Sequence, residues 1–395
     1  MKIRIKKMTI IYIAFFCITI SWSKFFIVRG LQDCLEYIGL FCILLGIYIR
    51  SYRKKDIKRI LLLVTIMFFF MIGLILQDLA ISKKVNAIVS MFILSSIAVM
   101  PCEKIQRFDN ILEIEKSIAF GLSVSTILGI ISGIGVTTGA SEGLVFNWGF
   151  NAGLEHRNYC SYVFFGMFII EYIRLKVGRA TNTNRLLIIA LLILSTNSRS
   201  AILLLFLFLV FSNINRIRLS TSNKRMGLAL FCFIGIVIGA LAFQVMKNNS
   251  ETYFFRLNGL FNYLKMFSSD IICMLFGNLK IACLDPNMSY DVNIRSVIGW
   301  NGSTELVLLN VLIKNGIIGL LGYFLIFAYY FKMAKKLQDE KLKNITFAII
   351  ISFIISAFVE SYVANINHIF TVFVYLLLSN ISKFDKCLKK ESELV

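Results

Sequence analysis

The chain has 395 residues, of which 58% are hydrophobic and 16% are charged, and its mean hydropathy is +0.78. A soluble domain has about 45–50% apolar and about 25% charged residues, so this composition excludes a soluble enzyme and a disordered chain. The net charge of +20 would indicate nucleic-acid binding in a soluble protein. Here most cations lie in short runs between apolar stretches, where they set membrane orientation, and we expect no nucleic-acid partner.

Twelve apolar stretches have the length of a membrane-spanning helix, which needs about 20 residues (range about 17–25). They predict an all-α, polytopic integral membrane protein whose residues 1–395 form a single transmembrane bundle. The predicted spans are 8–23, 33–50, 60–77, 85–101, 117–137, 158–175, 182–197, 199–215, 226–246, 304–331, 344–360 and 363–379.

Placing the N- and C-termini in the cytoplasm puts 30 of the 42 Lys and Arg residues in cytoplasmic segments. Residues 186–211 allow either one helix or two short helices broken at Ser195-Thr196-Asn197-Ser198-Arg199-Ser200. A single helix would invert every later loop and move cations outside, so the positive-inside rule favours the break. Arg199 then lies at a turn near the outer face.

The largest polar segment, residues 247–303, is then an external loop between the ninth and tenth helices. Long loops in compact proteins are usually functional or disordered. Apolar residues at helical spacing predict an amphipathic helix over about 252–267, which either lies on the membrane surface or packs on the bundle. Cys273 and Cys283 share this loop. Whether they pair stays open, because spacing alone does not establish a disulfide.

Ionisable groups at membrane depth are costly, which makes them candidates for function. Arg199 presents a fixed fork of donors suited to a phosphate, although it has the alternative of snorkelling from a helix end. Glu155-His156-Arg157-Asn158 precedes an apolar run, and a helix N-terminus there would favour an anionic or sugar ligand. The alternative for this motif is capping of the helix by Asn158.

Glu305 also stands at the start of an apolar helix, where it could act as a general base or simply stabilise the helix N-terminus. The external loop before it carries Arg256, Arg295 and Asn301 as further candidates. Gly316 follows, and it predicts a break or a close contact, with a short half-helix over 304–313.

Glu360 and His368 form the last candidate group. They could pair across the turn between the last two predicted spans, or each could hydrogen-bond to its own neighbours. No Walker A loop, HExxH or GxSxG motif occurs in the sequence, which has only two His residues. We therefore expect neither a cofactor nor a metal site.

Four segments together resemble one family. The run Ser195–Ala201 between two apolar stretches resembles the T-x-S-R-(G/S)-A step of the O-antigen ligase and Wzy-type polysaccharide polymerase superfamily. Gly153–Tyr159 resembles its G-x-x-(H)-x-N helix start, and Arg256 followed by Phe276-Gly277-Asn278 resembles the opening of its large external loop. Glu305–Leu320 resembles its H-N-x-x-L…G-(I/L)-(I/L)-G segment, with Glu305 where the ligases have His. The resemblance covers about residues 140–380, and the missing His favours the polymerase branch.

The resemblance implies a metal-independent glycosyltransferase in the bacterial cytoplasmic membrane. It would join undecaprenyl-pyrophosphate-linked repeat units into a polysaccharide on the outer face, beside a chain-length regulator and a flippase. The alternatives are a ligase that moves glycan to another acceptor, a lipid-linked oligosaccharide flippase or transporter, and a scaffold without a site. The implied roles are pyrophosphate binding for Arg199, Arg256 and Arg157, general-base catalysis for Glu305, and glycan binding for His156, Asn158, Arg295, Asn301 and Glu360.

Overall fold

The computed structural model describes residues 9–49, 57–77, 80–102, 105, 108–139, 148–177, 183–213, 259–265, 267–278 and 306–392. Helices make up 81% of these described residues. The helices are α1 (Thr9–Ser21), α2 (Lys24–Ile27), α3 (Gln32–Tyr48), α4 (Ile57–Leu76), α5 (Ile81–Val99), α6 (Phe108–Ile131), α7 (Arg157–Lys176), α8 (Thr183–Ser195), α9 (Arg199–Asn213), α12 (Ile271–Phe276), α15 (Val307–Lys335), α16 (Glu340–Ser356), η4 (Tyr362–Ala364) and α17 (Ile369–Ser392).

The structure agrees with the sequence on where helices occur. Each predicted span coincides with a helix except 226–246, which lies outside the described residues. Within the described residues, four helices could cross a membrane by length and composition: Ile57–Leu76, Ile81–Val99, Asn110–Ile131 and Val307–Lys335. The coarse prediction of a helical, multi-pass membrane protein is therefore confirmed, and the twelve spans and their orientation stay predictions.

Two helix starts differ most from the prediction. Helix α6 begins at Phe108 rather than at 117, and the added turns carry Glu115, which is paired with Arg185 inside the bundle. Helix α17 begins at Ile369 rather than at 363. The preceding residues form turns, in which the Asn365 side chain accepts from the Asn367 amide, and such local bonds compete with helix formation.

A small sheet departs from the all-α prediction. Strand β1 (Thr137–Gly139) pairs antiparallel with β2 (Trp148–Phe150), and Thr138 faces Gly149 in the register. Threonine and aromatic residues favour strands. This ribbon lies between α6 and α7 in the sequence.

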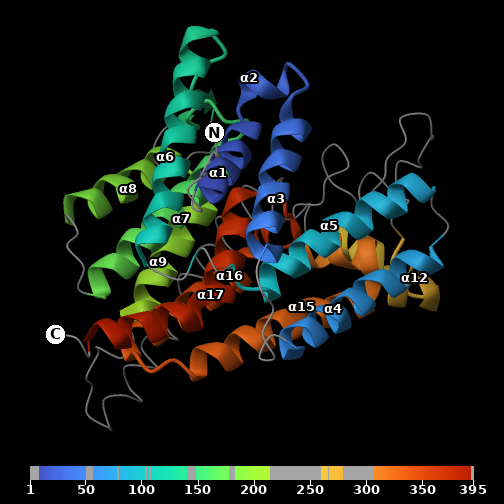
Figure 1. Ribbon diagram of the computed structural model, residues 1–395. Coiled ribbons are helices and arrows are strands. Elements are labelled where there is room, and N and C mark those ends of the chain that lie inside the picture. The colour runs from blue at the N-terminus through green and yellow to red at the C-terminus, as the bar shows by residue number, and fades with distance from the viewer. Residues whose placement is uncertain are drawn as a thin grey trace, which may run out of the picture.

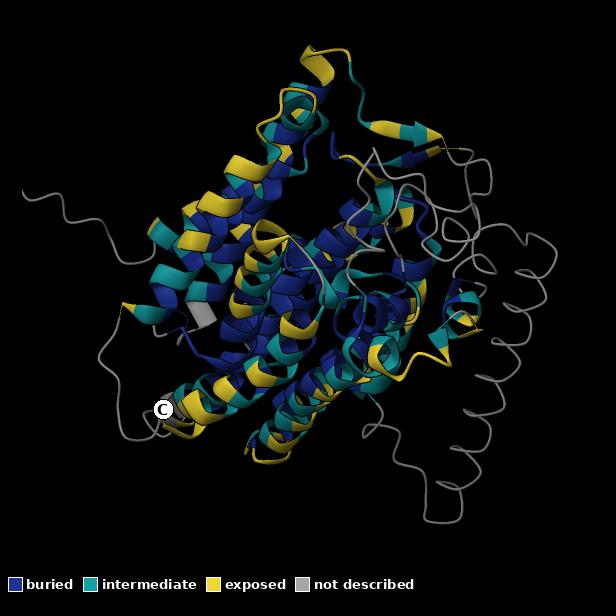
Figure 2. Cartoon of the chain, turned by 90° about the vertical axis from the view of Figure 1, so that its right-hand side faces the viewer, coloured by how far each residue is buried: buried dark blue, intermediate teal, exposed yellow. Residues whose placement is uncertain are grey.

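Helix α7 lies at the centre of the bundle, with every residue from Tyr159 to Ile173 buried. Helix α7 contacts α6, α8, α9, α16 and α17. Elsewhere in the bundle, α1 packs against α3 and α6, α9 packs against α16, and α15 packs against α4 and α12 (Figure 1). Buried residues concentrate in the interior of the bundle and exposed ones on its periphery (Figure 2). The apolar periphery fits a protein whose surroundings are lipid rather than water.

Helix α15 is interrupted at Gly316, where φ is 64° and ψ is −164°, so the predicted break at this glycine is confirmed. The carbonyl groups beside the break find partners elsewhere. The Gln77 side chain donates to the Lys314 carbonyl at 3.0 Å, and the Asn278 amide donates to the Ile313 carbonyl at 2.7 Å. A broken helix is tolerated in a membrane only when such groups are paired inside the protein.

The described part of the predicted surface helix is helical over 259–265. Tyr263 is fully buried and donates to the Leu312 carbonyl at 3.3 Å, whereas Phe261 is exposed. This part therefore packs on α15, which is the second of the two predicted arrangements. Cys273 is a free thiol, and Cys283 lies outside the described residues.

We expect Gly316→Ala to destabilise the protein more than Gly30→Ala. Both glycines have positive φ, 64° and 67°, which costs about 1–2 kcal/mol for a residue with a Cβ. A methyl group at Gly316 would also overlap the Leu275 carbonyl, whereas nothing lies within 4 Å of one at Gly30. Thermal unfolding in detergent measures both variants. Equal losses would contradict the close approach of α12 to the break.

Candidate functional site

The turn between α8 and α9 confirms the predicted break, since α8 ends at Ser195 and α9 begins at Arg199. Thr196, Asn197 and Ser198 are all buried although they are polar. Asn197 has a left-handed φ of 56°, which Asn tolerates better than most residues. The Thr196 hydroxyl accepts from the Ser198 amide at 3.3 Å and donates to the Ile193 carbonyl at 2.6 Å. Burial and local pairing thus fix the turn that carries Arg199.

This turn lies against β2 and the start of α7. The Asn197 side chain donates to the Trp148 carbonyl at 3.4 Å. A Cβ at Gly149 would overlap the Thr196 carbonyl oxygen and would lie 2.8 Å from Arg157 Cδ. Gly149 therefore allows the two arginine-bearing segments to meet, although about 40 residues separate Arg157 from Arg199 in the sequence.

The start of α7 differs from the prediction that Asn158 caps it. His156 is the N-cap residue, and its Nδ1 accepts from the Asn158 amide at 3.1 Å. The Asn158 side chain instead donates to Glu360 Oε1 at 3.0 Å. Glu360 is only 6% exposed. Because Asn158 is in α7 and Glu360 is in the turn that follows α16, their hydrogen bond ties these two segments together.

The residues before the cap attach to the α1–α2 turn. The Glu155 amide donates to the Trp22 carbonyl at 2.9 Å, and the Lys24 amide donates to the Gly153 carbonyl at 3.0 Å. Partial burial raises the pKa of the Glu155 carboxyl, and Lys24 acts in the opposite direction. The segment is thereby held at the end of the bundle that also carries the Arg199 turn.

His368 lies in an aromatic cluster, and its contacts agree with the second alternative, in which Glu360 and His368 each hydrogen-bond to their own neighbours. Its ring centroid is 4.0 Å from that of Tyr159 and 3.8 Å from that of Tyr362. Its Nδ1 accepts from the Phe370 amide at 3.1 Å, which caps α17. Trp22 stacks on Tyr159 at 4.6 Å. His368 is therefore a packing and capping residue in this structure.

Four predicted site residues, Arg256, Arg295, Asn301 and Glu305, lie outside the described residues. The start of α15, which follows them in the sequence, contacts the turn after α16. The amide of Val307, the first residue of α15, donates to the Ala357 carbonyl at 3.2 Å. The start of α15 therefore adjoins the turn that leads to Glu360.

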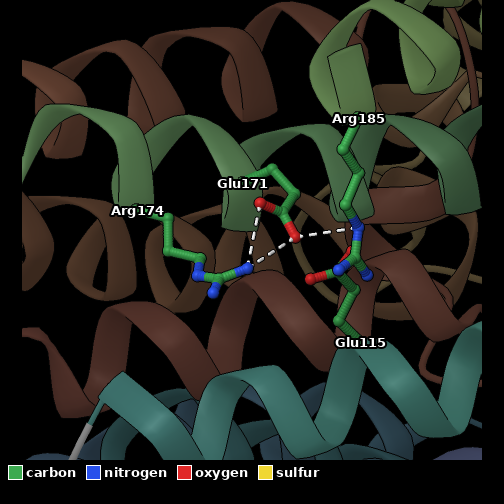
Figure 3. A network of polar contacts seen from close by, with 4 residues as sticks. All are labelled: Glu115, Glu171, Arg174 and Arg185. Carbon is green, nitrogen blue, oxygen red and sulfur yellow. Dashed lines mark hydrogen bonds and ion pairs between the residues drawn. The ribbon is translucent and has the colours of Figure 1, made fainter. Parts of the chain in front are cut away.

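The structure also contains a second cluster of polar side chains, which was not predicted from the sequence. Glu115 of α6, Glu171 and Arg174 of α7, and Arg185 of α8 form an ion cluster (Figure 3). Arg185 Nη2 lies 2.8 Å from Glu115 Oε1, and Arg185 Nε lies 3.0 Å from Glu171 Oε1. The signal that could have revealed it was Glu171, an acid inside an apolar run and one helical turn from Arg174.

Among the residues that the structure describes, no group of three His, Cys, Asp or Glu side chains is placed to hold a metal ion. The described candidate residues, His156, Arg157, Asn158, Arg199 and Glu360, carry imidazole, guanidinium, amide and carboxyl groups. Arginine pairs are suited to anionic ligands such as phosphates.

The apolar helices define the class, a multi-pass helical membrane protein. A scan of protein-family models finds no match to the sequence, and a search of the curated proteins finds none either.

We expect Asn158 and Glu360 to be energetically coupled. In a double-mutant cycle, Asn158→Ala and Glu360→Ala should show a coupling energy of about 1.5–3 kcal/mol, the range for a hydrogen bond to a charged group. Reversible denaturation in mixed detergent gives the four stabilities.

Glu113→Ala serves as the matched control for this cycle. Glu113 pairs with Lys116 on the surface of α6, near the other end of α7. Its effect should add to that of Asn158→Ala within about 0.5 kcal/mol. Additivity between Asn158 and Glu360 themselves would contradict the bond.

Proposed function

We propose that the chain is a membrane glycosyltransferase that polymerises undecaprenyl-pyrophosphate-linked repeat units into a polysaccharide on the outer face of the bacterial cytoplasmic membrane. The observation that carries the proposal is the meeting of the Glu155–Asn158 segment with the Ser195–Ser200 turn across Gly149. These two segments carry part of the resemblance to the O-antigen ligase and Wzy-type polymerase superfamily, and each supplies one arginine.

At the anomeric carbon of the donor, the proposed reaction forms one bond and breaks one. A hydroxyl group of the acceptor sugar attacks the anomeric carbon of the donor glycan, and the bond from that carbon to the lipid pyrophosphate breaks. Negative charge develops on the departing pyrophosphate. Fixed guanidinium donors in a partly dehydrated site stabilise such charge without a metal ion. Arg157 and Arg199 have this role in the proposal, with Arg256 as a third donor.

A carboxylate takes the proton from the attacking hydroxyl. We assign this role to Glu305, two residues before the helix start that adjoins the Glu360 turn. Asn158 and Glu360 are held together by their hydrogen bond, and with His156, Arg295 and Asn301 they are assigned to the glycan. Of these residues, the structure describes His156, Arg157, Asn158, Arg199 and Glu360, and their segments contact one another.

A flippase for lipid-linked oligosaccharides is the second candidate. The buried ion cluster of α6, α7 and α8 favours it, because transporters place ionisable groups within the bundle. Deletion of the gene followed by gel sizing of the surface polysaccharide separates the classes. Single repeat units on the external carrier indicate a polymerase, long carrier-bound chains that are never transferred indicate a ligase, and the absence of external repeat units indicates a flippase.

We expect Arg199→Lys to reduce glycan chain elongation by about 100-fold or more, the loss typical when one charge-stabilising donor is removed. Lysine keeps the charge but loses the planar fork of donors. Complementation of a deletion strain and gel sizing of the glycan measure the effect, with immunoblotting to verify insertion.

Arg29→Lys is the matched control. Arg29 is exposed, donates to the Phe25 carbonyl at 2.9 Å and stacks on the Phe25 ring. This variant should produce chains of normal length. Normal chains from Arg199→Lys as well would overturn the role of Arg199.

A further inference from the structure

The ion cluster at the other end of α7 distributes its donors unequally (Figure 3). Glu171 receives Arg185 Nε at 3.0 Å on Oε1 and Arg174 Nη1 at 3.2 Å on Oε1 and 3.3 Å on Oε2. Among the described residues, Glu115 receives only Arg185 Nη2, at 2.8 Å on Oε1. Within the part of the chain that the structure describes, Glu115 Oε2 is buried and has no hydrogen-bond partner.

Burial makes this difference costly. The side chains of Glu115 and Glu171 are both 0% exposed. A buried ionised carboxylate is tolerated when its oxygens are paired, and an oxygen without a donor incurs the full desolvation penalty. Two carboxylates that contact one guanidinium also repel each other, which favours a proton on one of them. Glu171 has donors on both oxygens, so the proton belongs on Glu115.

We propose that Glu115 is a proton-binding site that stays occupied at neutral pH in the folded protein. The occupied state holds neutral Glu115 beside Glu171 and the two guanidinium groups. On release, the O–H bond of Glu115 breaks, the electron pair stays on the carboxylate, and the proton passes to water. No oxidation or reduction is involved. This site is separate from the proposed glycosyltransferase site and does not depend on it.

Among the described residues, Arg185 of α8 pairs with Glu115, Glu171 of α7 shares the same guanidinium, and Arg174 of α7 pairs with Glu171. Helix α1, which also packs on this part of α6, contributes the Tyr12 carbonyl, which accepts from Ser117. The Arg185 side chain is 43% exposed. Movement of Arg185 would therefore uncover Glu115 and remove the donor that Arg185 supplies.

Infrared spectroscopy of the full-length protein in detergent tests the proposal directly. A protonated carboxyl group has a carbonyl stretch that a carboxylate lacks. We expect such a band in the wild type at neutral pH. The band should be lost in Glu115→Gln. It should be retained in Glu113→Gln, because the exposed Glu113 carboxylate of the wild type pairs with Lys116 at 2.7 Å. A wild-type spectrum without the band, or a band unchanged by Glu115→Gln, would overturn the proposal.

Stability provides a second measurement. Glutamine resembles neutral glutamic acid in shape, so Glu115→Gln should leave the melting temperature within a few degrees of the wild type. Glu171→Gln removes the ionised group that both arginines contact, so it should lower the melting temperature clearly. Equal losses from the two variants would show that both carboxylates are ionised, which contradicts a bound proton.

Discussion

The pairing of irregular backbone inside the protein is the constraint on which the rest of this structure depends. Lipid offers no partner for a free N–H or C=O group, so a chain this apolar can leave helical geometry only where other protein groups pair its backbone. The α8–α9 turn satisfies this requirement with its own side chains, Thr196 above all. The break in α15 satisfies it with Gln77 and the Asn278 amide.

The candidate site follows from the same constraint. The Arg199 turn, the start of α7 and the turn after α16 are each irregular, and packing one against another pairs their polar groups. Gly149 shows how close this packing is, because no side chain fits between Arg157 and the Thr196 carbonyl. Segments that are distant in sequence thus meet at one end of the bundle, where a polar ligand could be bound without crossing the apolar core.

Sequence reasoning found the features that depend on local pattern. Apolar length identified the helices, the cation distribution identified the break before Arg199, and Gly316 marked the interruption of α15. It missed features that depend on distant partners. The Asn158–Glu360 bond joins residues 202 positions apart, and the Glu115–Arg185 pair joins residues 70 positions apart. The predicted span 117–137 was also shorter than α6, whose earlier turns carry Glu115, which pairs with a residue distant in the sequence.

The most direct test of the central claim is an electron cryomicroscopy structure of the full-length protein in a lipid nanodisc with bound undecaprenyl pyrophosphate. The account predicts density for the diphosphate in contact with both Arg157 and Arg199, beside Gly149. Diphosphate density at the opposite end of α7, or guanidinium groups that face away from it, would contradict the account.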